Sequence, residues 1–468
     1  MRLSCGSLVV PLACGVAVSV LAADRAFTSY VSVKAVLDQP SDLLPAELRN
    51  PNEAKWSAWS QRQDNAIRAR LQQGDLDSMV NLLLYGTSFT KQPRIKVEAF
   101  TEASKAGILR ARVDDLVAGL RSPGENERLT FLNGLLRSQG IDPSSPGETG
   151  VFIYNNLQRV LQEMGTLAKR SEEAKRLIQP AQRDAVPDPA AIFNWRAGLF
   201  RERGVSLDTG IFPNFSIEQA LRDLKKRGVL REGQVARVAV IGPGLDFIDK
   251  NENASYDYYP QQTLQPFALY DSLVRLGLAK ANALSMSIFD ISPRVIDHIE
   301  RARERARKNV PNTGYVVQLP REAASPWPAD LIAYWRSLGD GVGAEVAPIT
   351  PPDVLQGPNG GQSLDTRAVR IRPDVVLSLQ PVDLNIVLER INLAEADRFD
   401  LIVGTNIFIY YDAFERSLAL ENAGAMLKRG GLLLTNDSLP EVSGGSMRLA
   451  GVTDVQYNHD SVGWYRRR

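Results

Sequence analysis

The stretch that most constrains the fold of this chain is Val235–Lys250, an apolar run followed by a glycine turn and an acid. The run Val235–Ile241 is rich in β-branched residues, which suits a strand buried on both faces of a parallel sheet. A Gly-Pro-Gly turn at 242–244 and then Asp246 follow. Open α/β sheets bind ligands beyond the carboxyl ends of their strands, where glycines let a ligand approach the backbone. The stretch therefore predicts a buried strand that ends at a ligand site.

Length and charge limit the class of protein. A chain of 468 residues is long enough for two or three domains, each with its own core. Lys+Arg number 55 and Asp+Glu 54, giving a formal charge of +1, so no overall field attracts nucleic acid or acidic lipid. We therefore expect no nucleic-acid partner, and contact with a membrane only through the N-terminal segment described next.

The N-terminus has the pattern of an export signal. Arg2 is followed by an uncharged run from Leu3 to Ala23, and small residues end the run before Asp24. This order predicts a signal peptide over residues 1–23. An apolar run of this length can also remain as a membrane anchor. We expect the chain to be exported or anchored, and cytoplasmic if the start site is wrong.

Cysteine and histidine are scarce. Cys5 and Cys14 both lie in the N-terminal segment, so its removal would leave no thiolate ligand or cysteine nucleophile. The two histidines are His298, in a charged helical pattern, and His459, in a polar turn, and both are expected at the solvated surface. This disfavours histidine metal sites and Ser-His triads, and no metal is predicted.

Residues 24–178 show a helical pattern throughout. In Trp56–Gln72 large apolar residues recur at helical spacing, and Gly74 is expected to stop that helix. No repeat of fixed period is present. We therefore expect an all-α accessory domain over 24–178. Its other helices are expected at Arg110–Leu120, Leu129–Leu136 and Gly150–Lys169.

Three segments are expected to be connections. Leu82–Arg94 ends an apolar run in a polar loop, which suits either a ligand-facing loop or, as we favour, an ordinary capped helix end. Residues 179–194 contain three prolines and are expected to link two domains. Leu207–Phe215 combines turn residues with large apolar side chains, so a lid and a packed connection are equally compatible with it.

Residues 195–468 alternate between strand and helix patterns, which predicts a doubly wound parallel α/β sheet. Its last strands, Val452–Tyr457 and Val462–Tyr465, are expected to form an antiparallel edge hairpin. The other expected strands are Ser285–Phe289, Tyr315–Leu319, Val375–Leu379, Phe399–Gly404 and Leu432–Thr435. Helices are expected at Ser216–Gly228, Pro266–Ala281, Val295–Lys308, Ser325–Leu338 and Phe414–Leu427, the last ended by Gly430-Gly431.

The glycine turn does not match the dinucleotide fingerprint. That fingerprint is G-x-G-x-x-G with an acid about 20 residues further on. Here Phe247 replaces the third glycine, and the acid that ends the second strand, Asp290, follows Gly242 by 48 residues. A nicotinamide-dependent oxidoreductase is therefore the weaker alternative.

The order of motifs resembles that of class I S-adenosylmethionine-dependent methyltransferases, over roughly Arg231 to Tyr465. A glycine turn ends the first strand, an acid ends the second, and an Asp-Leu pair precedes the FDLIVGTN segment. FDLIVGTNIFIYYD at 399–412, continued by LKRGGLLL at 427–434, particularly resembles chemotaxis-receptor-type methyltransferases. The resemblance implies a Rossmann-like fold and S-adenosyl-L-methionine as cofactor.

The resemblance also implies cofactor contacts. The glycine turn and Asp246 would hold the methionine part, and the Asp290 carboxylate would accept hydrogen bonds from the ribose hydroxyls. Asp383 and Leu384 would contact the adenine. The implied cofactor-binding residues are Gly242, Gly244, Asp246, Asp290, Ile291, Asp383, Leu384 and Asn406.

The acceptor side is less defined. Methyl transfer requires an oriented nucleophile and a desolvated sulfonium, often without a strong general base. Tyr410, Tyr411 and Asp412 lie where the family places substrate-facing residues, and ordinary packing is the alternative. Because the segment lacks an N-P-P-Y pattern, a nucleic-acid base is disfavoured. We expect methyl transfer to a small-molecule or protein acceptor, with a non-catalytic binding or scaffold module of the cell envelope as the alternative.

Overall fold

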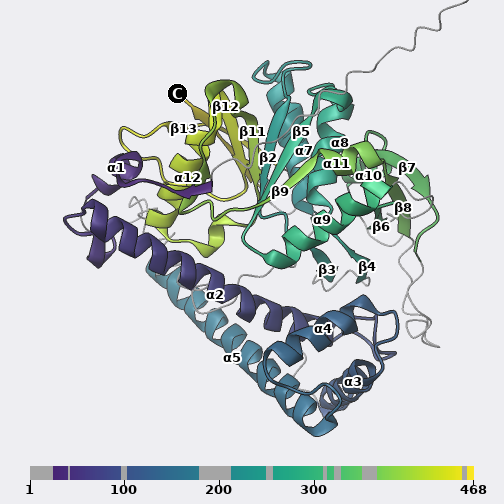
Figure 1. Ribbon diagram of the computed structural model, residues 1–468. Helices are drawn as coiled ribbons and strands as arrows, with labels where there is room; N and C mark the ends of the chain where they lie inside the picture. The colour runs from purple at the N-terminus through teal and green to yellow at the C-terminus, as the bar shows by residue number, and fades with distance from the viewer. Residues whose placement is uncertain are drawn as a thin grey trace, which may run out of the picture.

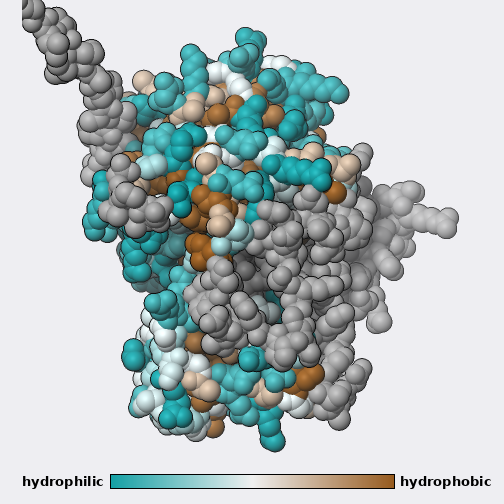
Figure 2. All heavy atoms as spheres, turned by 90° about the vertical axis from the view of Figure 1, so that its right-hand side faces the viewer, coloured by the Kyte–Doolittle hydropathy of each residue, from teal (hydrophilic) through white to brown (hydrophobic). Residues whose placement is uncertain are grey.

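The computed structural model describes most of the chain. The predicted signal segment 1–23, the linker 179–194 and His459 lie outside the described residues, as do Leu207–Ile211 of the possible lid. No helix in the described part is long and apolar enough to cross a membrane. On the face that Figure 2 shows, the described surface is mostly hydrophilic, with apolar residues in small groups. The described ranges are 25–40, 43–95, 103–178, 212–248, 257–308, 314–320, 328–349, 366–455 and 461–468.

A mixed seven-stranded sheet forms the centre of the C-terminal half, in the order β13-β14-β12-β11-β2-β5-β9 (Figure 1). Five neighbouring strands, from β12 to β9, pair in parallel, and β14 is antiparallel to both β12 and β13. The strands are β2 (Arg237–Ile241), β5 (Ser285–Asp290), β9 (Leu379–Asp383), β11 (Phe399–Gly404), β12 (Leu427–Thr435), β13 (Met447–Asp454) and β14 (Ser461–Arg467).

Helices cover both faces of this sheet, and β2 contributes to both hydrophobic cores. Val238 and Val240 pack in one core, while Ala239 and Ile241 pack in the other, as alternation along a strand requires. This explains why Val238–Ile241 is apolar at every position. The first core includes α7 (Phe212–Lys226), α8 (Gln265–Arg275), α9 (Pro293–Lys308), α10 (Ala329–Ser337) and α11 (Pro373–Ser378), and the second includes α1 (Lys34–Leu37) and α12 (Ala413–Met426).

Small antiparallel sheets flank the main one. The expected strand at 315–319 forms, but it belongs to a separate sheet of order β6-β8-β7 and not to the main sheet. β3 pairs with β4 directly after the glycine turn, and β1 pairs with β10. These strands are β1 (Arg25–Phe27), β3 (Asp246–Ile248), β4 (Asp257–Gln262), β6 (Val316–Pro320), β7 (Gly343–Val346), β8 (Thr366–Ile371) and β10 (Glu389–Ile391).

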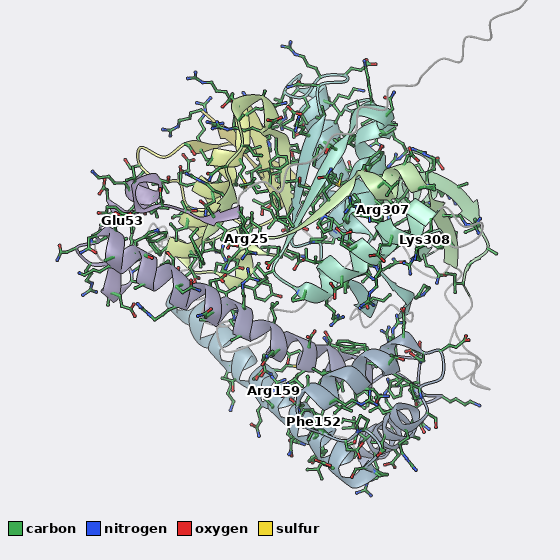
Figure 3. All side chains as sticks on the ribbon, in the orientation of Figure 1. Arg25, Glu53, Phe152, Arg159, Arg307 and Lys308 are labelled. Atoms are coloured by element: carbon green, nitrogen blue, oxygen red, sulfur yellow. The ribbon has the colours of Figure 1, made fainter. Side chains whose placement is uncertain are left out.

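The N-terminal half is divided between two cores. α2 (Glu53–Tyr85) starts on the α/β body, where Trp56 and Ile67 join its core, and ends among α3 (Ala103–Arg121), α4 (Glu127–Ser138) and α5 (Pro146–Ile178) (Figure 1). We call the C-terminal half of α2 with α3, α4 and α5 the helical lobe. In it Arg159 of α5 reaches Asp77 of α2 at 2.6 Å (Figure 3).

The expectation of an all-α unit over 24–178 needs correction. β1 makes this region part of a sheet, because it pairs with β10 from the other half of the chain. Gly74 does not end the first helix, and α2 continues through it to Tyr85. A glycine inside a helix costs only about 1 kcal/mol, which the buried residues beyond it offset.

Three local expectations in the C-terminal half were wrong. Val375–Leu379 is not a strand: Pro373 occupies the first turn of α11, which packs on α9, and the strand β9 begins at Leu379. The helix expected to start at Ser216 begins earlier, at Phe212, the first residue of α7. The Gly430-Gly431 pair lies inside β12, where the register with β11 shifts.

Candidate functional site

The glycine turn at the end of β2 is held in a conformation that favours glycine. Gly242 has φ 59° and Gly244 has φ 62°, both in the left-handed region. The Gly242 N–H donates to the Phe289 carbonyl at 2.7 Å, which fixes the turn to the end of β5. A Cβ on Gly242 would lie 2.1 Å from Cδ1 of Ile407. The turn thus requires glycine at position 242, where Ile407 occupies the space of a side chain.

Asp290 ends β5 and is brought to this turn. Its side chain is 5% exposed, and Oδ1 accepts a hydrogen bond from the Ser292 N–H at 2.8 Å. The N–H groups of Gly244 and Ile291 also donate to this carboxyl group. Burial nevertheless raises the pKa of Asp290 to about 7, with the charge of Asp383 adding to the effect. The sequence-predicted turn and acid therefore form one polar site.

Asp246 faces a different partner. It is 2% exposed, and its Oδ2 accepts from Nε2 of Gln262 at 3.2 Å. The same Gln262 amide donates to the Gln318 carbonyl and accepts from the Gln318 N–H. Asp246 is thereby connected to β6 of the small sheet.

The end of β11 lies beside the turn, because β11 and β2 are neighbours in the sheet. Thr405 Oγ1 accepts from Gln265 Nε2 at 2.6 Å. Asn406, at φ 58°, exchanges two hydrogen bonds with Asn436 beyond β12: its N–H donates at 2.9 Å and its Oδ1 accepts at 2.8 Å. Asn406 is exposed at the same sheet edge as the glycine turn.

At the end of β9, Asp383 is bound by two arginines. Arg25 lies 2.9 Å from Oδ2 and Arg68 lies 2.8 Å from Oδ1. Both arginines also face Glu389, which is 1% exposed at its side chain. Leu384, 2% exposed, packs in the core, and its N–H donates to the Asp290 carbonyl at 3.1 Å. Asp383 and Leu384 thus adjoin Asp290, but both already make other contacts, and their adenine role stays a prediction.

α2 crosses this edge of the sheet. Arg68 donates to the Ile291 carbonyl at 3.4 Å, and Leu71 packs against Ile291 and Tyr410. Arg70 donates to the Tyr410 carbonyl at 3.3 Å. Sequence reasoning did not find these α2 residues, because they lie more than 200 positions from the strands they meet and outside the region of resemblance.

The three acceptor-side candidates lie together but differ in environment. Tyr411 is 4% exposed in the core, where burial raises its pKa. Asp412 forms a capping box with Glu415 at the start of α12, which is a structural role. Tyr410 is partly exposed, and the guanidinium of Arg70 lies 5.9 Å from its ring centroid.

His298 is not the solvated residue that the sequence predicted. Its Nε2 is 2.8 Å from the Tyr315 hydroxyl, and the two rings meet edge to face. Burial, with the nearby arginines of α9, lowers the pKa of His298 to about 4. Its imidazole is therefore neutral at physiological pH and packs against the ring of Tyr315.

Comparisons with known proteins find similar solved structures. No family model matches the sequence, and no curated protein matches it. The chain is similar to the N-methyltransferase NodS from Bradyrhizobium japonicum, solved with S-adenosyl-L-homocysteine, at 13% identity and TM-score 0.26, covering 56% of this chain and 90% of that chain.

Two further solved structures are similar at the same level. Magnesium protoporphyrin IX methyltransferase from Synechocystis, with bound SAM, has 10% identity and TM-score 0.26, covering 64% of this chain and 90% of that one. A TehB-like SAM-dependent methyltransferase from Corynebacterium glutamicum has 11% identity and TM-score 0.24, and the match covers 55% of this chain and 100% of that chain. Likeness at these scores does not establish an activity. The chain's own sheet, mixed, seven-stranded and flanked by helices, fits a Rossmann-like methyltransferase fold.

Proposed function

We propose that this chain transfers a methyl group from S-adenosyl-L-methionine to a small-molecule or protein acceptor. One observation carries the proposal. β2 lies between β11 and β5, so the strand order reverses beside it, and the glycine turn at this point meets the buried acid Asp290. Open α/β sheets bind their ligands in the crevice at such a switch point.

The residues around the turn fit the polar parts of this cofactor. The turn carries no side chain at Gly242 or Gly244, and Asp246, which is bonded to Gln262, would offer its carboxyl group to the methionine ammonium. Asp290, once ionised, accepts hydrogen bonds from two ribose hydroxyls, while Ile291 offers an apolar surface and Asn406 a polar one. When bound, the cofactor supplies a methyl group on a sulfonium.

The adenine end meets α2. Asp383 and Leu384 remain the proposed adenine contacts, but Arg25 and Arg68 now hold Asp383. Binding through Asp383 would therefore need the amine of adenine to share a carboxylate with two guanidinium groups, or α2 to move. We propose that α2 acts as a cover over this end of the site.

The acceptor would enter beside Tyr410. Of the three candidates, Tyr411 is in the core and Asp412, although partly exposed, caps a helix, which leaves Tyr410 as the partly exposed side chain outside that capping box. Leu71 and Arg70 of α2 lie next to it. Together they can orient an acceptor and exclude water, the two requirements of methyl transfer.

Calorimetry of the full-length chain with S-adenosylmethionine tests the cofactor. Saturable binding is expected, and Asp290→Ala is expected to weaken it roughly 30-fold, as the loss of a charged hydrogen-bond acceptor implies. Asp297→Ala on the exposed side of α9 is the control and should bind like the parent. Absence of saturable binding by the folded parent would disprove the proposed cofactor.

The same calorimetric assay distinguishes the alternative functions. Binding of NAD but not of S-adenosylmethionine would indicate the oxidoreductase. Cofactor binding without methylated product across small-molecule and protein acceptors would indicate a scaffold module, an alternative consistent with the cover formed by α2. The proposed export or anchoring through residues 1–23 is tested by fractionating cells that express the tagged full-length chain.

A further inference from the structure

A polar cavity lies at the edge of the sheet opposite the glycine turn. Its volume is about 330 Å³, within the range of small-molecule sites. Arg398 directly precedes β11, and Arg467 reaches the Leu427 carbonyl at the start of β12, so the cavity is at the amino ends of these strands. β11 is six residues long, which separates the cavity from the glycine-turn edge by roughly 17 Å. The lining includes Ser32, Arg390, Arg398, Glu421, Ser446 and Arg467.

Positive charge exceeds negative charge around this cavity. Three arginines line it with one carboxylate, Glu421, both of whose oxygens accept from the Ser446 N–H, at 3.1 and 2.9 Å. Glu395 pairs with Arg398 and lies 3.6 Å from Arg467, so one carboxylate serves two guanidinium groups. The arginines around the cavity therefore outnumber the carboxylates that neutralise them.

Arg390 is the cation that the surroundings compensate least. Its Nη2 donates to the hydroxyl of Ser32 at 2.6 Å, a neutral acceptor. Partial burial and the like charge of Arg398 both lower the pKa of Arg390. The same like charge and burial lower the pKa of Arg467. A bound anion would relieve this repulsion.

A serine hydroxyl lies beside the arginines. Ser32 is exposed on the lining, and its hydroxyl accepts the hydrogen bond from Arg390. Guanidinium forks together with a hydroxyl group are the donors that proteins use for phosphate oxygens.

We propose that this cavity binds the phosphate group of a small molecule, with Arg390, Arg398 and Arg467 as the cationic contacts and Ser32 as a hydroxyl contact. The ligand class follows from the excess of arginine, the volume of the cavity and the hydrogen-bonding groups of its lining. The site is separate from the proposed cofactor site, and it does not depend on methyl transfer being the activity.

The test is calorimetry of the full-length chain with inorganic phosphate, pyrophosphate and a phosphorylated sugar, and with citrate as a carboxylate of similar charge. Saturable binding of at least one phosphate compound is expected. Arg390→Gln is expected to weaken it about tenfold or more, and Arg390→Lys less, because lysine keeps the charge but loses the planar fork.

Arg301→Gln removes the same charge from the exposed side of α9 and serves as the control, with unchanged affinity expected. Thermal unfolding identifies any variant that has not folded, and Ser32→Ala then provides a second, uncharged probe of the cavity. Three results would overturn the proposal: no saturable phosphate binding by the parent, equal loss in Arg390→Gln and Arg301→Gln, or binding of citrate alone.

Discussion

The two edges of the central sheet differ in charge and in how they are covered. At the carboxyl edge the strands end in acids, Asp290 and Asp383, beside a glycine turn, and α2 lies across them. At the amino edge arginines line an open cavity, and Arg390 is its least compensated charge. The same five parallel strands thus have acids and their arginine partners at one edge and an excess of arginine at the other.

The two edges are physically joined by β10. Glu389 and Arg390 are adjacent on this strand, so their side chains point in opposite directions. Glu389 meets Arg25 and Arg68 at the carboxyl edge, while Arg390 lines the basic cavity. Whether the edges act independently is therefore a question that substitutions can decide.

The largest effect is expected at the glycine turn. Gly242→Ala should destabilise the fold by about 2–5 kcal/mol, because a Cβ would combine a left-handed φ with contact against Ile407. Denaturant unfolding measures this change. Gly140→Ala is the matched control, since Gly140 has φ +76° but nothing within 4 Å of its Cβ position. An equal loss in both variants would show that the backbone angle alone matters.

A pH dependence should follow from Asp290. Its folded-state pKa is about 7, well above its unfolded value, so the unfolded chain releases this proton first. The free energy of unfolding should therefore fall as pH rises from about 4 to 7, by on the order of 3–4 kcal/mol. Asp290→Asn should flatten this slope and Asp297→Asn should not. A parent profile that is flat over this window would contradict the buried, protonated state.

The same proton affects the cofactor. Because the ionised carboxylate is the better acceptor for ribose hydroxyls, affinity for S-adenosylmethionine should rise between pH 6 and 8, up to about tenfold. Calorimetry at several pH values measures this, with Asp290→Asn expected to remove the dependence. An affinity that falls over the same interval would rule out this role for Asp290.

Removal of Arg68 should loosen the cover over the acidic edge. Arg68→Ala leaves Asp383 and the buried Glu389 with Arg25 alone, so a loss of about 1–3 kcal/mol is expected by denaturant unfolding. Arg62→Ala on the same helix breaks an exposed pair with Glu47 and should cost at most about 1 kcal/mol. Similar losses would mean that α2 is not fixed by this cluster.

The smallest effect is expected between the edges. If the sites are independent, Asp290→Ala should change phosphate affinity by less than about twofold, because well-separated changes are additive within about 0.5 kcal/mol. Arg390→Gln should likewise leave cofactor affinity unchanged. A larger cross-effect, measured by calorimetry with each ligand, would show that β10 couples the two edges.

The sequence by itself determined the centre of the α/β body. Val238 to Ile241 are apolar at every position because both faces of β2 are buried, and such a run is readable without any tertiary information. The glycine turn and Asp290 follow strands that are readable in the same way. Parallel strands that carry polar groups at their carboxyl ends bring those groups to one edge, so this side of the candidate site could be predicted.

Only the tertiary structure decided what lies against that centre. Arg25 and Arg68 contact Asp383 from more than 300 residues away in the sequence, and no local sequence pattern predicts such contacts. Gly74 stays helical because α2 packs on both cores, and Ser32 meets Arg390 only after the chain has folded. Periodicity and turn chemistry act over a few residues, whereas a cover or a cavity depends on which distant surfaces come together.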